Sequence, residues 1–135
     1  MPKFDIPSLL IIGNPLLPKD TVQFKVGRVV SSKLSLPIRY LQYPDDLIYE
    51  HGYLIDVVKG LTRPRLIGLH EIRLTQSITS HDWDVSQVLR LMDVLGLEPQ
   101  VKIIGIPYGR TPDDDLISEI LHLIEEDLGD ATAGI

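Results

Sequence analysis

Hydrophobic residues follow two patterns that alternate along the chain. Short continuous apolar runs, such as Ser8 to Ile12, stop at turn residues and predict buried strands. Longer segments, such as Thr21 to Leu34, place Val residues three and four positions apart and predict amphipathic helices. The predicted strands cover residues 8–12, 37–42, 53–58, 65–75 and 101–106, and the predicted helices cover residues 21–34, 84–95 and 113–128.

Capping residues mark the ends of two of these helices. Asp20 is expected at the N-cap of the first helix, with Gln23 three residues later as its reciprocal partner. The three aspartates 113–115 place negative charge at the positive end of the last helix dipole. Because Gly129 is expected to end that helix, residues 129–135 are predicted to form a frayed tail.

Strands that alternate with helices predict an α/β protein. We expect one domain, residues 1–135, built as a three-layer α/β/α sandwich around a central, mostly parallel five-stranded sheet. Sheets of this kind bind ligands at the carboxyl ends of their strands. Polar residues near those ends are therefore the candidates for chemistry.

Composition excludes several classes of function. The formal net charge is −6 and the basic residues are scattered, which argues against a nucleic-acid partner. The chain has no cysteine, so thiolate metal sites, disulfides and cysteine nucleophiles are excluded. The first apolar run is too short to cross a membrane, so we expect a cytoplasmic protein without membrane insertion.

Three polar residues fall where the predicted fold would present them to a ligand. Asp20 follows the first strand through a short loop, Asp56 interrupts a buried strand near its end, and His81 lies in a polar loop before a helix. Each also has a structural interpretation, as an N-cap, a strand-end carboxylate and a surface histidine, respectively. Together, two carboxylates and one imidazole suit nickel, zinc, manganese or iron and leave coordination positions open.

The segments around these residues resemble the nickel–iron hydrogenase maturation endopeptidases. Gly13-Asn14-Pro15-Leu16 with Asp20 is similar to the opening motif of that family, and Leu54-Ile55-Asp56 is similar to its second ligand at a strand end. Ser80-His81, the helix after it and the strand Val101 to Pro107 are similar to the segments that contain and follow the family's histidine ligand. The resemblance spans roughly residues 8–128.

This resemblance implies an activity, a substrate and a ligand set. A peptidase of this family recognises nickel in the precursor of a hydrogenase large subunit and removes its C-terminal extension. Asp20, Asp56 and His81 would then be the catalytic, metal-binding residues, and Asn14 and Ser80 would bind substrate. The nickel would come with the precursor, zinc or cadmium would serve as surrogates, and the protein would act as a monomer.

The chain departs from the family pattern at several positions. Ile11 replaces a glycine of the opening motif, Lys19 replaces the first acid of a pair, and Gln23 replaces a glycine at the helix start. The Asp-Gly-Gly-Thr loop after the second strand has no counterpart here.

Two other interpretations remain open. One is a non-catalytic assembly factor that binds nickel or a hydrogenase subunit. The other is a receiver-like signalling domain phosphorylated at Asp56, although such domains carry an acidic pair after the first strand, where this chain has Gly13-Asn14.

Overall fold

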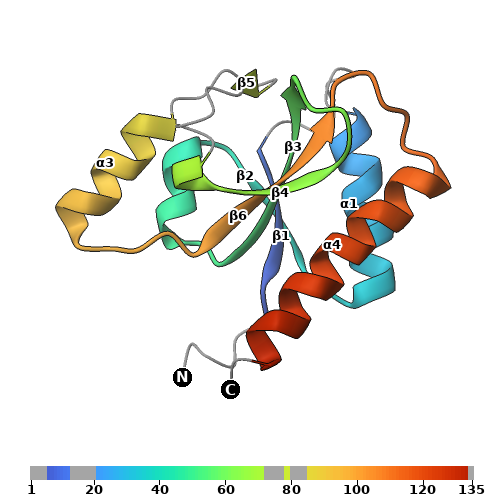
Figure 1. Cartoon of the computed structure of the whole chain (residues 1–135). Coiled ribbons are helices and arrows are strands. Elements are labelled where there is room, and N and C mark those ends of the chain that lie inside the picture. Colours follow the sequence, from blue (N-terminus) through green and yellow to red (C-terminus); the bar gives the residue numbers. More distant parts are fainter. Residues whose placement is uncertain (1–5, 13–20, 72–77, 80–84, 134–135) are drawn as a thin grey trace.

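The computed structural model describes residues 6–12, 21–71, 78–79 and 85–133. It confirms the predicted fold class: a mostly parallel sheet lies between two layers of helices (Figure 1). The strands are β1 Ser8–Ile12, β2 Ile38–Leu41, β3 Gly52–Lys59, β4 Arg65–Gly68, β5 Ile78–Thr79 and β6 Val101–Pro107. The helices are α1 Thr21–Leu34, the 3₁₀ helix η3 Pro44–Tyr49, α3 Val85–Leu95 and α4 Asp114–Ala133.

The sheet has the order β2-β1-β3-β6-β4, with β5 paired to β3 outside this path. The four strands β2, β1, β3 and β6 are parallel, whereas β4 runs antiparallel to β6. The chain passes from β1 to one neighbour, β2, and then returns to the other neighbour, β3. In a parallel sheet this reversal of strand order is the usual place for a ligand site.

Two apolar clusters fill the space between the layers. On one face, α1 and α4 cover side chains that include Leu9, Ile55 and Ile104. On the other face, α3 and η3 cover side chains that include Leu10, Leu54 and Ile103. Successive residues of each strand thus belong to opposite clusters, which explains why the strands read as continuous apolar runs in the sequence.

Four elements differ from the sequence predictions. The two-residue strand β5 was not predicted. The strand predicted over 65–75 ends at Gly68, because residues 69–71 form a helical turn in which His70 is exposed. The 3₁₀ helix η3 was not predicted. The prediction that α4 ends at Gly129 is wrong: the helix continues to Ala133 and includes the first residues of the expected tail.

The predicted cap of α1 involves Asp20 and Gln23. The Gln23 side chain is 1% exposed, and neither of its polar atoms has a hydrogen-bond partner among the described residues. Asp20 itself lies outside the described residues. The other end of the helix closes without glycine: Ser35 takes a positive φ of 56°, and the Leu36 N–H donates to the Ser31 carbonyl.

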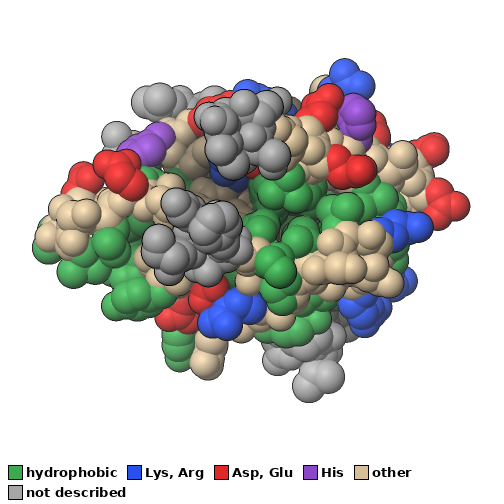
Figure 2. Space-filling model, turned by 90° about the horizontal axis from the view of Figure 1, so that it is seen from below, with side chains coloured by type: hydrophobic (Ala, Val, Ile, Leu, Met, Phe, Trp, Pro, Cys, Tyr) green, Lys and Arg blue, Asp and Glu red, His purple; other side chains and the backbone are tan. Residues whose placement is uncertain are grey.

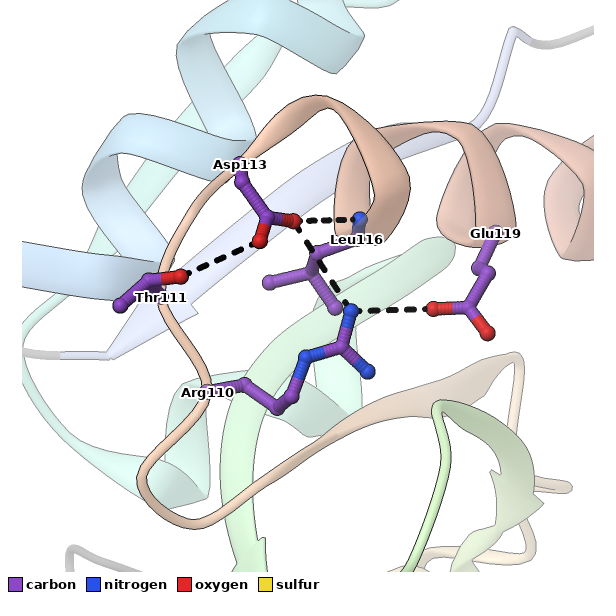
Figure 3. A network of polar contacts seen from close by, with 5 residues as sticks. All are labelled: Arg110, Thr111, Asp113, Leu116 and Glu119. Carbon is purple, nitrogen blue, oxygen red and sulfur yellow. Dashed lines mark hydrogen bonds and ion pairs between the residues drawn. The ribbon is translucent and has the colours of Figure 1, made fainter.

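The aspartates at the start of α4 provide a cap, as predicted (Figure 3). Asp113 accepts the backbone N–H of Leu116 at 2.9 Å and a hydrogen bond from the Thr111 hydroxyl at 3.2 Å. The bond from Leu116 is the main cause of a lowered pKa for the Asp113 carboxyl. Arg110 pairs with Glu119 at 3.2 Å and lies 3.9 Å from Asp113, so the loop after β6 is tied to the first turns of α4.

A second polar contact joins α4 to the amino ends of β3 and β6. The Tyr53 hydroxyl and the Lys102 ammonium each donate to Asp127, both at 2.6 Å. Burial and the bond to Asp127 raise the pKa of the Tyr53 hydroxyl. Burial alone would raise the pKa of Asp127, but the hydrogen bonds from Lys102 and Tyr53 outweigh it, and the pKa is lowered.

We predict that Asp127→Asn lowers the free energy of unfolding by about 1 kcal/mol at pH 7, a modest loss because the pair with Lys102 is partly screened by solvent. The folded pKa of Asp127 is depressed, so its contribution is present above the unfolded pKa of about 3.9 and is lost as the pH falls through the folded pKa. Urea titrations from pH 7 down to pH 3 should therefore show the two proteins converging. A difference that stays constant over this range would contradict the assignment.

Gly52 allows the first residues of β1 and β3 to approach. Its φ is +147°, and a Cβ there would lie 1.9 Å from the Ser8 carbonyl oxygen, which belongs to the backbone. The same residue starts the β1–β3 pairing, because Gly52 is in register with Ser8. No side chain can move aside to relieve this contact, so only glycine fits.

We predict that Gly52→Ala lowers the free energy of unfolding by about 3 kcal/mol, through backbone strain and displacement of β1. Gly129→Ala is the matched control: this residue is inside α4 with nothing within 4 Å of the added Cβ, so the helix should become more stable by about 0.5–1 kcal/mol. Thermal or urea unfolding should give opposite signs for the two variants. Equal effects would show that the close approach of β1 and β3 does not limit stability.

Candidate functional site

The strands β1 and β3 pair only over their first residues. Their register runs from Ser8 opposite Gly52 to Leu10 opposite Leu54 and stops there. By contrast, β3 stays paired with β6 as far as Val58 opposite Pro107. We call Ile11 and Ile12 of β1, together with residues 55–59 of β3, the β1/β3 divergence. It lies at the carboxyl ends of both strands, where the strand order reverses.

Asp56 lies in the β1/β3 divergence and is 1% exposed. Its Oδ1 accepts the backbone N–H of Val57 at 2.9 Å. Tyr53, Ile55 and Val57 belong to the cluster under α1 and α4, so alternation along β3 places Asp56 on the opposite face, with Leu54. A carboxylate in such apolar surroundings requires compensating partners.

The neighbouring strand β6 is closely packed beside Asp56. Gly105 is in register with Asp56, and a Cβ on it would lie 2.7 Å from Leu61 and 3.3 Å from both Val58 and Ile67. Side chains from three segments therefore occupy the space above Gly105. The β6 side of Asp56 is closed, and any ligand must approach from the side of β1 or from the strand ends.

The short strand β5 lies on the β1 side of β3. It pairs antiparallel with β3, with Thr79 opposite Val58 and Ile78 opposite Lys59. Because Val58 is also in register with Pro107 of β6, β5 must occupy the other edge of β3, the one that β1 has left. Figure 1 shows β5 at the carboxyl end of the sheet, at the top of the view.

Two exposed residues form part of the rim at this end. Lys59 ends β3, and its ammonium lies 5.7 Å from the centre of the Tyr108 ring, which follows β6 and is 70% exposed. A cation held against a ring at this distance gains a modest attraction. The carboxyl end of the sheet thus presents a positive charge and an aromatic surface above the buried Asp56.

Of the predicted site residues, only Asp56 lies within the described part of the chain. Asn14, Asp20, Ser80 and His81 lie outside it. The structure describes a residue next to two of them: Thr21, which follows Asp20, starts α1, and Thr79, which precedes Ser80, ends β5. Within the described residues, no group of three or more His, Asp or Glu side chains could hold a metal ion.

Gln23 is a buried polar residue that the sequence analysis treated only as part of a cap. Among the described residues, Gln23 and Asp56 are the buried polar side chains. A signal was present in the sequence: Gln23 falls on the stripe of α1 that continues through Val26, Gly27 and Val30 and faces the sheet. A polar residue on an apolar stripe is the kind of exception that requires an explanation.

The other polar features of the surface lie elsewhere. A shallow cleft of about 590 Å³ runs between α4 and the loop before β4, and it is lined by Arg63, Pro64, Ser118, Glu119, Leu121, His122, Leu123 and Glu125. His122 is exposed and pairs with Glu126 on the same helix at 3.0 Å. None of the predicted site residues lines this cleft, so it offers no support for their roles.

Apolar side chains are exposed at the end of α3. Val94 is 78% exposed and Leu95 is 49% exposed. Figure 2 shows hydrophobic side chains gathered on the α3 side of the molecule, seen from the end opposite β5. This patch is therefore separate from the β1/β3 divergence. No helix in the described part of the chain is both long and apolar enough to cross a membrane.

Comparisons with models of protein families, with curated proteins and with solved structures found no match to this chain.

We predict that Asp56→Ala lowers the free energy of unfolding by about 1–3 kcal/mol, because the buried Val57 N–H would lose its acceptor. Asp56→Asn keeps an acceptor oxygen and should cost less. Urea denaturation of the three proteins at pH 7 measures both effects. If Asp56→Ala were more stable than the wild type, the bond to Val57 would not be what offsets the burial of this carboxylate.

Proposed function

We propose that this protein is a metal-dependent endopeptidase that recognises nickel in the precursor of a hydrogenase large subunit and removes the C-terminal extension of that precursor. It acts in the cytoplasm, as a monomer. Asp20, Asp56 and His81 bind the nickel that the precursor brings, and Asn14 and Ser80 contact the polypeptide. Zinc or cadmium can take the place of nickel at the same side chains.

One observation carries this proposal: Asp56 is buried in the β1/β3 divergence, at the reversal of strand order. A carboxylate there is not needed to complete an apolar core and lowers stability unless it is compensated. A role toward a ligand at the carboxyl ends of the strands accounts for it.

The described neighbours of the other two residues support the same grouping. Thr79, two residues before His81, pairs with Val58, two residues after Asp56. Thr21, the residue after Asp20, starts α1, the helix whose Gly27 packs against β1 and β3 through Ile11 and Ile55. These described residues lie at the end of the sheet where the proposal requires Asp20 and His81 to act.

The chemistry needs no nucleophilic side chain. Two carboxylates and an imidazole occupy part of the coordination sphere of a borderline metal and leave positions for substrate. The substrate nickel polarises the scissile carbonyl or an attacking water as a Lewis acid. This agrees with a chain that has no cysteine and no serine-hydrolase motif.

Of the two alternatives, the receiver-like domain fits less well. Receiver domains carry an acidic pair just after the first strand, whereas this chain has Gly13-Asn14 there. A non-catalytic assembly factor would use the same three side chains to hold nickel without cleaving a peptide bond. Cleavage of a precursor distinguishes the peptidase from this assembly factor.

The test is processing of a purified precursor, loaded with nickel or free of it, followed by mass spectrometry. We predict cleavage of the nickel-loaded form alone, and a loss of at least about a hundredfold in rate for Asp20→Ala, Asp56→Ala and His81→Ala, since each removes a ligand. His122→Ala is the matched control: this histidine is exposed on α4, away from β3, and its loss should leave the rate unchanged.

Equal cleavage of nickel-free precursor would refute the metal-reading mechanism. Tight binding of the nickel-loaded precursor without any cleavage would identify an assembly factor. Incorporation of phosphate at Asp56 from acetyl phosphate would favour the receiver-like interpretation.

A further inference from the structure

Gln23 is the third residue of α1, and it is buried. The side chain is 1% exposed, and neither Nε2 nor Oε1 has a hydrogen-bond partner in the described part of the chain. A primary amide can donate two hydrogen bonds and accept two, so all of this capacity is unused. An apolar side chain of the same size would fill the position with less loss of stability.

The position of Gln23 in the helix directs it toward the β1/β3 divergence. Gly27, one turn later on the same face, packs against the side chains of Ile11 and Ile55. Side chains in a helix lean toward its N-terminus, so Gln23 extends from this contact toward the start of α1. The start of α1 follows β1, at the carboxyl end of the sheet. Gln23 therefore lies at the same end of the sheet as Asp56, although α1 covers the opposite face.

The chemistry of the amide indicates the kind of ligand. A carboxylate or phosphate would pair with the N–H groups alone, and a metal ion would use the oxygen alone. A main-chain peptide group presents one carbonyl and one N–H, and it therefore satisfies both ends of the glutamine amide at once. The Gln23 amide is already shielded from solvent, so binding a peptide group does not require the protein to release water from this side chain.

From these observations, we infer that Gln23 binds a main-chain peptide group of the precursor and holds the cleaved segment at the carboxyl end of the sheet, the end at which Asp56 lies. This inference rests on the proposed function and adds to it a substrate-binding residue at a position where the resembling family has glycine. Gln23 binds the polypeptide without touching the metal. Its loss should therefore weaken substrate binding more than it slows the chemical step.

The test compares Gln23→Met and Gln23→Leu with the wild type in two measurements. Both variants remove the unpaired amide and keep a side chain of similar size, so the thermal midpoint should rise by about 3 °C or more. In steady-state processing of the nickel-loaded precursor, KM should rise about tenfold with little change in kcat. Gln100→Leu is the matched control, since Gln100 is exposed and its substitution should change neither quantity.

The two readouts separate this inference from the proposed function. If Gln23 has a purely structural role, both variants should have a lower thermal midpoint. If trapped water satisfies its side chain, KM should not change. Either result, obtained while the wild type still processes precursor, overturns the role of Gln23. Failure of the wild type itself to cleave nickel-loaded precursor overturns the proposed function and, with it, the identity of the bound peptide.

Discussion

The structure depends on how far β1 and β3 stay together. Gly52 permits a backbone contact with Ser8 that starts their pairing, and the pairing stops after Leu10 and Leu54. On its other edge, β3 is held by β6 over seven residue pairs, from Gly52 opposite Val101 to Val58 opposite Pro107. On the edge that β1 leaves, β5 pairs with Val58 and Lys59. Everything proposed about function takes place at the edge that β1 leaves.

Two buried polar side chains, Asp56 and Gln23, lie at the carboxyl end of the sheet, and neither is typical of an apolar core. Asp56 accepts the Val57 N–H, whereas Gln23 has no hydrogen-bond partner among the described residues. Natural proteins give up stability at sites that serve a function. Among the described residues, the other buried side chains of the core are apolar on both faces of the sheet.

Much of the fold could be predicted from the sequence because its signals are local. The stripe of α1 predicted both of its ends, and the run Val101–Pro107 is too apolar to be anything but a central strand. The prediction failed where a long-range partner decides the conformation. The strand expected over residues 65–75 keeps only its first four residues, which pair with β6, and α4 continues through Gly129 to Ala133. Asp56 and Gln23 also differ in how easily the sequence reveals them. An aspartate inside an apolar run stands out in the sequence. A glutamine near a helix start has a plausible capping role, and only the packed structure shows that it is buried without a described hydrogen-bond partner.

The β5 strand has a further consequence for the energetics of the molecule. Two residues joined to β3 by two register pairs contribute little to the total free energy of folding. They can separate from β3 while β6 and both apolar clusters hold the remaining sheet intact, which makes this strand a unit of low local stability. Residues 78 and 79 are therefore able to leave the edge of β3 and return at small thermodynamic expense, without unfolding the domain.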